Sequence, residues 1–356
     1  MAVLAPGRGR PTLRPLIPGD LLMKALRPIV VALAALLTAC SPGKKDAASG
    51  GAGRQPTQIR FATDWRAQAE QGGYYEALAT GEYKKHGLDV KIVQGGPGVN
   101  VPQLLAAGAV EMGMGSNSFI VMNLAQQGVP VKAVAAYFQK DPQVLMAHPD
   151  QGVRTLADLK GHPILLSDAS VGAFWPWLKA KYGFADDQIR KYTFNSAPFL
   201  ADKRVAEEGY VSSEPYTLEK QAGLKPLVFL LADNGYPGYA NMALAPDSLI
   251  AKNPAAVKAF VEATAQGWHD YLYGDPKPGD ALIRKDNPEM TQDVLDQARD
   301  KMRTYGLVDS GDAKTAGIGV MTDARWKTFT DMAVSEGVYP KTFDPKRAYT
   351  LQFVGK

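Results

Sequence analysis

The fold class is decided by residues 58–93, which read QIRFATDWRAQAEQGGYYEALATGEYKKHGLDVKIV. Residues 59–62, Ile-Arg-Phe-Ala, predict a short strand. Residues 73–86 carry apolar side chains at helical spacing and end before Gly87, a residue type that commonly caps helices. Residues 89–93 alternate polar and apolar side chains, which predicts a second strand. A strand, a helix and a strand in this order predict a mainly parallel sheet covered by helices.

The same alternation continues along the chain. Further strands are expected at residues 110–113, 131–137, 144–147, 164–166, 192–194, 209–211, 227–231, 242–245 and 349–353. Helices are expected at residues 102–107, 118–127, 155–160, 172–182, 198–208, 254–273 and 291–305. The sequence therefore predicts an α/β protein whose last third is mostly helical.

An export signal precedes this body. Residues 23–27 form a basic start with Lys24 and Arg27. An apolar run follows at residues 29–39, about half the roughly 20 residues that a membrane span needs. The run ends in Leu37-Thr38-Ala39-Cys40, which contains the single cysteine of the chain. The order resembles a bacterial lipoprotein signal, which implies that Cys40 becomes a lipidated N-terminus. The alternative is an ordinary signal peptide with a chance cysteine.

The segments on either side of the signal have different roles. Residues 1–22 are rich in proline and arginine and show no periodicity, so we interpret them as a mis-assigned start, with a genuine extension as the alternative. Residues 40–57 are small and polar, as in a flexible lipidated tether. Ser41 is not the aspartate that commonly retains lipoproteins at the inner membrane, so either membrane of a Gram-negative cell is open.

The basic balance of the chain comes from its leader. The full sequence has 40 Lys and Arg against 36 Asp and Glu, and residues 1–39 hold five of the former and one of the latter. The remaining chain carries 35 of each, so its charge gives no indication of a nucleic-acid partner. With no cysteine after Cys40, it has no internal disulfide.

Five segments in order resemble one family: the periplasmic substrate-binding proteins of ABC importers, in the branch for nitrate, sulfonates and thiamine-pyrimidine precursors. They are DW with GYY at 64–75, GEYKKHGLDV at 81–90, LLAAGAVEMG at 104–113, TLADLKG at 155–161 and GYVSSEP at 209–215. The resemblance implies the two-lobed periplasmic-binding-protein fold (type II), each lobe a mainly parallel sheet flanked by helices. Two crossing strands near 139–148 and 234–245 would form the hinge, with lobe 1 at 58–140 and 241–356 and lobe 2 at 141–240.

Ligands of open α/β sheets bind beyond the carboxyl ends of the strands. We therefore expect ligand contacts from Asp64, Trp65, Gln71, Tyr74, Tyr75, Gly96, Ser116, Asn117, Ser170, Trp175 and Glu214. The aromatic residues could stack on a ring, and Glu214 could accept hydrogen bonds from ring amino groups. The helix starts at Ser116 and Ser170 could hold an anion. Some of these residues also have a structural alternative. Asp64 could cap a turn, Asn117 could be a helix N-cap, and one of the two tyrosines could lie in the core.

Together with the predicted signal, the resemblance implies a lipid-anchored solute-binding protein on the periplasmic face of a bacterial membrane. It would deliver a small heteroaromatic ligand, a thiamine-type aminopyrimidine, to an ABC permease with its ATPase. An alkanesulfonate, taurine or nitrate is the alternative ligand. We expect a monomer that touches the membrane only through its lipid and needs no cofactor, metal or nucleic acid. A sensor partner in place of the permease stays open.

A pyrimidine-synthesis enzyme of the same fold is the alternative from another class. Gln71 stands where that enzyme branch has a histidine, and the chain lacks the cysteine cluster of that branch. The four histidines are isolated and show no metal-ligand spacing. The sequence therefore favours binding over catalysis.

Overall fold

The computed structural model describes residues 55–96 and 98–355. The predicted leader at 1–22, the signal peptide at 23–39, Cys40 and nearly all of the tether lie outside these residues, so the lipid anchor stays a prediction. Within the described residues, no helix combines the length and the apolar character needed to cross a membrane.

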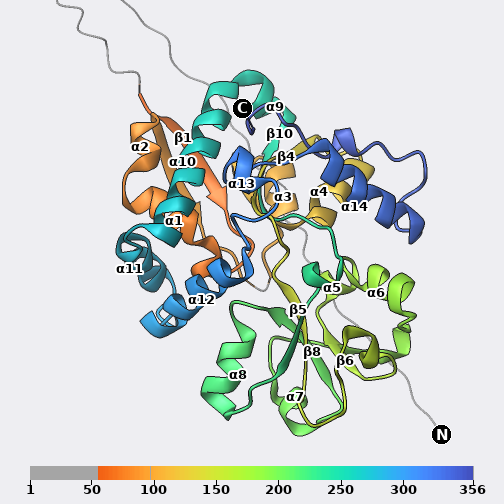
Figure 1. Cartoon of the computed structure of the whole chain (residues 1–356). Coiled ribbons are helices and arrows are strands. Elements are labelled where there is room, and N and C mark those ends of the chain that lie inside the picture. Colours follow the sequence, from red (N-terminus) through yellow and green to blue (C-terminus); the bar gives the residue numbers. More distant parts are fainter. Residues whose placement is uncertain (1–54, 97, 356) are drawn as a thin grey trace, which may run out of the picture. The chain divides into compact units, whose positions relative to one another are not determined.

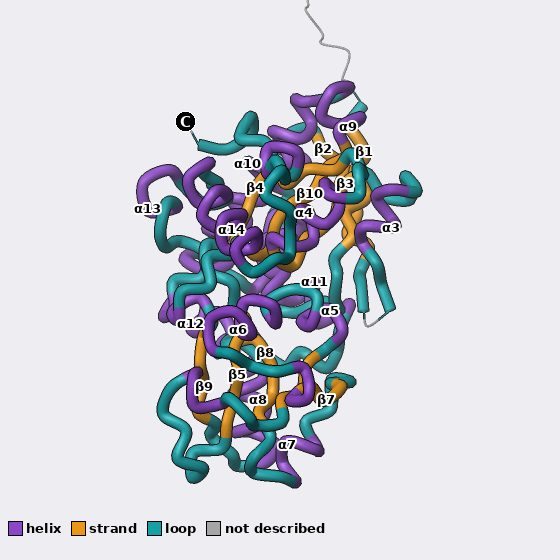
Figure 2. The backbone as a smooth tube through the Cα atoms, turned by 90° about the vertical axis from the view of Figure 1, so that its right-hand side faces the viewer, coloured by secondary structure: helices purple, strands orange, loops and turns teal. Residues whose placement is uncertain are grey.

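The strands form two five-stranded sheets, which Figures 1 and 2 show as two separate groups. The first sheet, in the order β2-β1-β3-β10-β4, contains β1 (Thr57–Ala62), β2 (Leu88–Val93), β3 (Met112–Asn117), β4 (Val131–Phe138) and β10 (Ala240–Pro246). The second sheet, in the order β7-β6-β8-β5-β9, contains β5 (Gln143–Ala147), β6 (Ile164–Leu166), β7 (Ile189–Lys191), β8 (Ala206–Tyr210) and β9 (Leu227–Leu230). Each sheet with its helices forms one lobe of the predicted two-lobed α/β fold.

Both sheets are mixed, where the sequence predicted mainly parallel ones. In the first sheet β1 is parallel to β2 and β3, whereas β10 is antiparallel to β3 and β4. In the second, β6 is parallel to β7 and β8, whereas β5 is antiparallel to β8 and β9. The crossings explain this arrangement. The chain leaves the first sheet at the carboxyl end of β4 and returns at that same end, so β10 must run antiparallel to β4.

The chain changes sheets between Phe138 and Gln143 and again between Leu230 and Ala240. Arg325 ties both crossing segments together, since its guanidinium donates to the carbonyl oxygens of Pro237 (3.1 Å) and Gly238 (3.0 Å) and to that of Gln139. The boundaries predicted for the lobes, 140/141 and 240/241, stay predictions.

Helices cover both faces of the first sheet and surround the second (Figure 1). The α-helices are α1 (Gly72–Ala79), α2 (Glu82–Lys85), α3 (Val101–Ala106), α4 (Ser118–Gln126), α5 (Asp168–Val171), α6 (Trp175–Tyr182), α7 (Ala197–Ala201), α8 (Glu214–Ala222), α9 (Asp247–Lys252), α10 (Pro254–Tyr273), α11 (Lys277–Asp286), α12 (Gln292–Tyr305), α13 (Ala313–Ala316) and α14 (Asp323–Ser335). Short 3-10 turns occur at Ala69–Gln71, Leu156–Leu159, Asp186–Gln188, Ala232–Asn234 and Pro345–Arg347.

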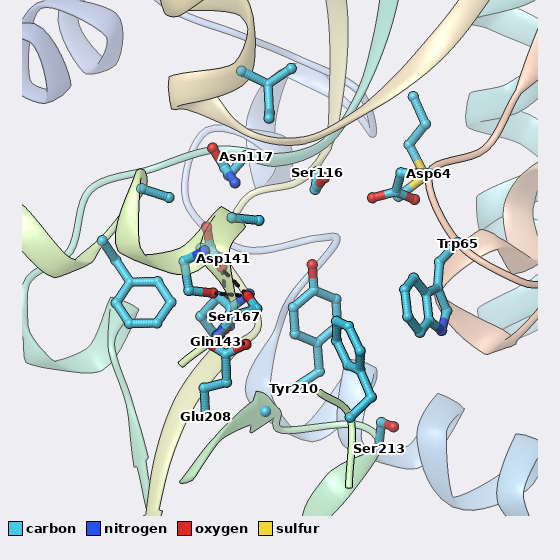
Figure 3. A pocket seen from close by; sticks show the side chains of 18 of the residues that line it. Asp64, Trp65, Ser116, Asn117, Asp141, Gln143, Ser167, Glu208, Tyr210 and Ser213 are labelled. Atoms are coloured by element: carbon cyan, nitrogen blue, oxygen red, sulfur yellow. Dashed lines mark hydrogen bonds between the residues drawn. The ribbon is translucent and has the colours of Figure 1, made fainter. Parts of the chain in front are cut away.

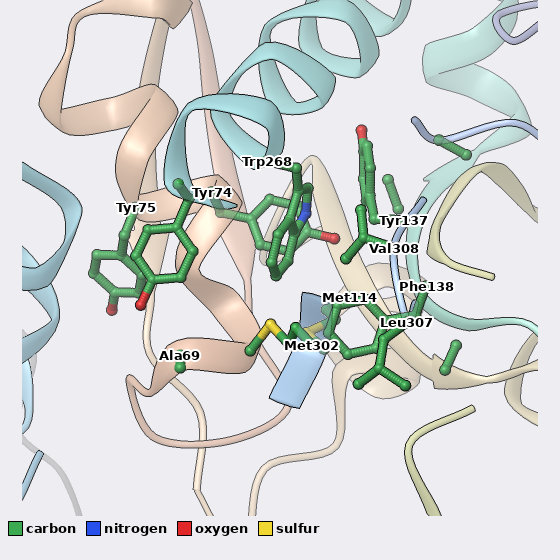
Figure 4. Close-up of a cluster of buried hydrophobic side chains, with 14 of the residues drawn as sticks. Ala69, Tyr74, Tyr75, Met114, Tyr137, Phe138, Trp268, Met302, Leu307 and Val308 are labelled. Atoms are coloured by element: carbon green, nitrogen blue, oxygen red, sulfur yellow. The ribbon is translucent and has the colours of Figure 1, made fainter. Parts of the chain in front are cut away.

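The longest helix, α10, illustrates how the sequence produces these elements. Asn253 caps its first turn by accepting from the Ala256 N–H at 3.2 Å, and Pro254 occupies the first helical position, where its missing N–H costs nothing. Phe260 and Trp268 fall on one buried stripe. That stripe packs against α1, where the Tyr74 and Trp268 rings meet edge to face at 6.4 Å between centroids (Figure 4).

Four secondary-structure predictions are wrong. The expected helix at 73–86 is interrupted at Gly81, whose φ of 74° breaks the helical path between α1 and α2. The expected helix at 198–208 ends at Ala201, because β8 pairs with strands on both sides. In place of the strand expected at 192–194, the structure has β7 just before it, at Ile189–Lys191. The segment 349–353, also expected to be a strand, makes a single bridge, from Tyr349 to Ala133.

Candidate functional site

A cavity of about 420 Å³ is lined by residues from both lobes. Its polar side chains include Asp64, Gln71, Ser116, Asn117, Asp141, Gln143, Ser167, Ser170, Glu208 and Glu214, and its aromatic ones are Trp65, Phe174, Tyr192, Phe194, Tyr210 and Tyr236. Figure 3 shows Trp65 and Asp64 at one side of this cavity, Gln143 and Glu208 at the other, and Tyr210 between them. A cavity of this size accommodates a small organic ligand.

The first lobe contributes residues at the carboxyl ends of its parallel strands. Asp64 and Trp65 follow β1 after Thr63, and Ser116 and Asn117 are the last residues of β3. Because β1 and β3 are parallel neighbours, their carboxyl ends meet at the same edge of the sheet. The Asn117 side chain caps α4 by accepting from the Phe119 N–H at 3.0 Å.

The second lobe contributes a face of its sheet. In β8, Glu208 and Tyr210 are two residues apart, so their side chains point to the same face. Gln143 of β5 lies opposite Tyr210 in the antiparallel register and shares that face. All three line the cavity. Glu207 points to the opposite face, where it accepts from the Ser196 hydroxyl at 2.6 Å.

The side chain of Glu208, which belongs to β8, lies against the start of α5. It is 5% exposed, and its Oε1 accepts from the Ser167 N–H at 3.0 Å. The Ser167 hydroxyl in turn donates to the Ser170 Oγ at 3.0 Å. Burial raises the pKa of Glu208, and the two serines offset part of that rise. A carboxyl group therefore already occupies the helix start at Ser170, where the sequence predicted a possible site for an anion.

Asp64 and Asp141 are two further carboxyl groups of the cavity wall. Burial raises the pKa of Asp64, although Ser116 offsets part of the rise, and its Oδ1 has no hydrogen-bond partner among the described residues. Asp141 is 1% exposed and accepts from the Gln143 N–H at 3.0 Å. Burial raises its pKa to about 7, and Arg325 opposes the rise.

Glu214, at the start of α8, is held close to the β8 strand. Its Oε2 accepts from the Tyr210 N–H at 2.6 Å, and its Oε1 accepts from the Ser213 hydroxyl at 3.2 Å. A Cβ at Gly209 would lie 2.8 Å from the Glu214 Cβ, so only glycine permits this approach. Burial raises the pKa of Glu214.

The lining is acidic. Its carboxyl side chains are Asp64, Asp141, Glu208 and Glu214, and no Lys, Arg or His stands among the described residues that line it. Nor does any part of the described chain gather His, Cys, Asp and Glu in a group that could hold a metal ion. The cavity can thus accept hydrogen bonds from a ligand far more readily than it can neutralise an anion.

Most of the predicted contact residues line the cavity: Asp64, Trp65, Gln71, Gly96, Ser116, Asn117, Ser170 and Glu214. This placement is compatible with ligand contact, which stays a prediction. Gln71 is 1% exposed, and its Oε1 accepts from the Gln68 N–H at 3.0 Å, so it also closes its own turn.

Tyr74, Tyr75 and Trp175 are not among the lining residues and belong to the core. The Tyr74 hydroxyl donates to Asn241 at 2.9 Å, and the Tyr75 hydroxyl to Asp286 at 3.0 Å. The Trp175 indole N–H donates to Asp186 at 2.8 Å. All three are almost completely buried, so in this structure they support the lobes rather than face a ligand.

Sequence reasoning missed several lining residues, above all Phe194, Glu208 and Tyr210. Phe194 has a φ of 60°, rare for a residue with a side chain, and is 52% exposed. Its ring lies 4.6 Å from that of Trp65 between centroids. Two adjacent acids within an apolar segment, Glu207 and Glu208, were a usable signal, because one of them had to face inward.

Comparison with known proteins adds the family. Residues 68–278, more than half of the chain, match the family described as NMT1/THI5 like. The chain belongs to this family. The fold agrees with the solved periplasmic aliphatic sulphonate binding protein SsuA of Escherichia coli, with a TM-score of 0.61 at 15% identity over 82% of this chain and 91% of that one.

Two further proteins are similar over most of the chain. The periplasmic nitrate-binding protein NrtA of Synechocystis PCC 6803 has a TM-score of 0.60 at 13% identity, over 84% of this chain and 87% of that one. The riboflavin-binding protein RibY of Chloroflexus aurantiacus is 25% identical over 333 residues, which are 90% of this chain and 94% of RibY. The NMT1/THI5-like chain thus has the two-lobed fold of periplasmic solute-binding proteins of ABC importers.

Proposed function

We propose that this NMT1/THI5-like protein is a lipid-anchored solute-binding protein that delivers a small aromatic heterocycle, a thiamine-type aminopyrimidine, to an ABC importer. The observation that carries the ligand class is the composition of the cavity wall. Flat aromatic rings stand beside four carboxyl groups, with no cationic side chain among the described lining residues. Rings suit a heterocycle, and carboxylates suit its amino groups.

The proposed contacts divide between the lobes. Trp65 and Phe194, which approach each other from different lobes, are the surfaces on which a ring can stack. Asp64 and Glu208 each keep a buried oxygen free to accept a hydrogen bond. A ligand that engages both lobes stabilises the closed form, which is the form that an importer would recognise.

The same wall disfavours the alternative ligands, sulfonates and nitrate. An anion in this cavity would face carboxyl groups at Asp64, Asp141 and Glu208 without a neutralising side chain among the described lining. The start of α5, which could have held it, already binds Glu208 through the Ser167 N–H. The likeness to SsuA and NrtA concerns the fold alone.

A flavin is a second candidate from the same ligand class. It is favoured by the relation to RibY, which covers 90% of this chain. A flavin also has a ring system for Trp65 and an imide N–H for a carboxylate acceptor. The cavity volume of about 420 Å³ falls within the range of small-ligand sites and does not separate the two ring sizes.

The enzyme reading receives less support than binding. Gln71 lines the cavity at the place where the pyrimidine-synthesis branch is expected to have a histidine, and the chain has one cysteine, Cys40. Turnover of an aminopyrimidine by the purified protein would support the enzyme hypothesis.

A sensor role is a separate alternative to transport. Loss of growth on the ligand after deletion of the gene would favour transport over a sensor role.

The proposal is tested by calorimetry and thermal unfolding of the purified protein with aminopyrimidines, thiamine, riboflavin, taurine, an alkanesulfonate and nitrate. A ligand at 100 times its Kd adds about 2.7 kcal/mol to the free energy of unfolding, a shift of a few degrees for a body of this size. We expect heterocycles to shift the Tm and anions to leave it unchanged. A shift with anions alone would refute the ligand class but leave the solute-binding role.

A further inference from the structure

The second-lobe side of the cavity holds two buried acceptor atoms without donors among the described residues. Glu208 is 5% exposed and lines the cavity, yet its Oε2 has no hydrogen-bond partner among the described residues. Gln143, from the neighbouring strand, likewise has an unpartnered Oε1. A buried polar atom without a partner is destabilising, so such atoms in a binding cavity indicate what a ligand must supply.

The backbone register brings these acceptors together. Gln143 pairs with Tyr210, and Leu145 pairs with Glu208, so the two acceptor side chains stand on adjacent strands of one sheet face. Figure 3 shows Asp141, Gln143, Ser167 and Glu208 gathered at this side of the cavity. Asp141 adds a second buried carboxyl group there.

No protein cation answers this group. The described lining contains no Lys, Arg or His, and the groups that act on the Glu208 carboxyl, the Ser167 N–H and the hydroxyls of Ser167 and Ser170, are all neutral. A buried carboxylate that lacks a cation is costly, and a cation that completes the pair removes most of that cost. A neutral ligand would donate hydrogen bonds here but leave the charge uncompensated.

We propose that the ligand binds as a cation, with a protonated amino group beside the Glu208 carboxylate and within the acceptor set of Gln143 and Asp141. This inference rests on the proposed function and narrows it: the protein selects a heterocycle with a positively charged substituent over the same ring with a neutral one. The aromatic side of the cavity, at Trp65 and Phe194, then takes the ring, and the acidic side takes the charge.

The test is a matched pair of ligands measured by calorimetry on the purified protein. One is the aminopyrimidine half of thiamine with an aminomethyl substituent, which is a cation at neutral pH. The other is the same ring with a hydroxymethyl substituent, which is neutral and nearly identical in size. We expect the aminomethyl compound to bind at least tenfold more tightly. Equal affinity, or tighter binding of the hydroxymethyl compound, overturns the inference while the proposed function stands.

The variant Glu208→Gln locates the charge. It keeps the acceptor for the Ser167 N–H but removes the negative charge, so it should weaken the aminomethyl compound at least tenfold and leave the hydroxymethyl compound within twofold. Glu207→Gln is the matched control, because Glu207 is adjacent and buried but faces away from the cavity toward Ser196. It should leave both affinities unchanged.

The remaining outcomes are also decisive. If Glu208→Gln does not fold, Asp141→Asn is measured in its place above the Asp141 pKa of about 7, where this carboxyl is ionised, and a loss of discrimination is again expected. Unchanged discrimination in the folded variant overturns the assignment of the charge to this group. Binding of riboflavin in preference to both pyrimidines overturns the cationic class but leaves a heterocycle-binding protein. Binding of none of the three contradicts the proposed function itself.

Discussion

The rings of Trp65 and Phe194 approach to 4.6 Å between centroids, with their planes tilted by 47°. Trp65 follows β1 of the first lobe, and Phe194 follows β7 of the second, so this contact joins residues from two different sheets. Both line the cavity. The contact exists only when the lobes are close together, which makes the pair a sensitive position for ligand binding and for lobe closure.

Replacement of Trp65 by alanine should weaken binding of a heteroaromatic ligand about tenfold, because it removes a ring contact worth roughly 0.5–1.5 kcal/mol together with buried apolar area. A ring stacked on Trp65 should quench the tryptophan fluorescence of the protein. Trp65→Phe should keep most of the affinity but abolish this quenching by the ligand. Trp65 is the one tryptophan of the chain's five that lines the cavity. Tyr273→Ala, an exposed ring on α10, is the control. Quenching that persists in Trp65→Phe would contradict this prediction.

Phe194 should show opposite effects on stability and binding. Its φ of 60° costs a residue with a Cβ roughly 1–2 kcal/mol, and glycine avoids that cost. Phe194→Gly should therefore unfold at a higher temperature than Phe194→Ala, while both lose affinity for the ligand. At Leu200, which is similarly exposed but lies in helix α7, the order should reverse, with alanine more stable than glycine. The same order at both positions would argue against strain at Phe194.

Asp293 should influence affinity without contact to the ligand. From α12 in the first lobe it accepts from two side chains of α8 in the second, the Tyr216 hydroxyl and the Lys220 ammonium, each at 2.6 Å. Asp293→Asn should weaken this link between the lobes and raise the apparent Kd roughly two- to fivefold, and less in high salt. Asp331→Asn, which breaks an exposed pair within α14, is the control. A Kd unaffected at low salt would show that the link does not influence closure.

The ligand-free protein should lose stability as the pH rises through the neutral range. Burial raises the pKa of Asp141 from the ordinary 3.8 to about 7, so the folded protein holds this proton to a higher pH than the unfolded chain does. The stabilisation is complete below the unfolded pKa and is lost as the pH rises through about 7. Glu70 and Glu207 act in the same direction.

Thermal unfolding as a function of pH measures this effect. Asp141→Asn should reduce the fall in Tm between about pH 4 and pH 7, because asparagine does not titrate. Gln143→Ala, at a neighbouring position without a titrating group, should leave the slope unchanged. A Tm that rises over this range would contradict the assignment.

The periodicity of the chain determined a large part of the fold. The strand at 59–62, the break before Gly87 and the strand at 89–93 follow from local preferences and from the alternation of buried and exposed residues, so the sequence alone predicts them. The positions of Asp64, Trp65, Ser116 and Asn117 follow in turn, because residues at the carboxyl ends of parallel strands meet at one edge of the sheet.

What the sequence could not predict depends on which surface each side chain faces. Phe174 and Trp175 are adjacent aromatic residues, yet only Phe174 lines the cavity, because consecutive residues at a helix start point in directions about 100° apart. Tyr74 and Tyr75 are both buried, since α1 is covered by α10 on one side and by α11 on another.

The sequence by itself determined an α/β chain with strand ends suited to a ligand and, by its export signal, a predicted lipid anchor. Only the tertiary structure decided that Phe194 meets Trp65 and that Glu208 rather than Glu207 faces the cavity. Those outcomes depend on the register between β5 and β8 and on the approach of two lobes, that is, on pairings between residues far apart in the chain. Local periodicity carries no information about such pairings, because their free energy arises only when the distant segments meet.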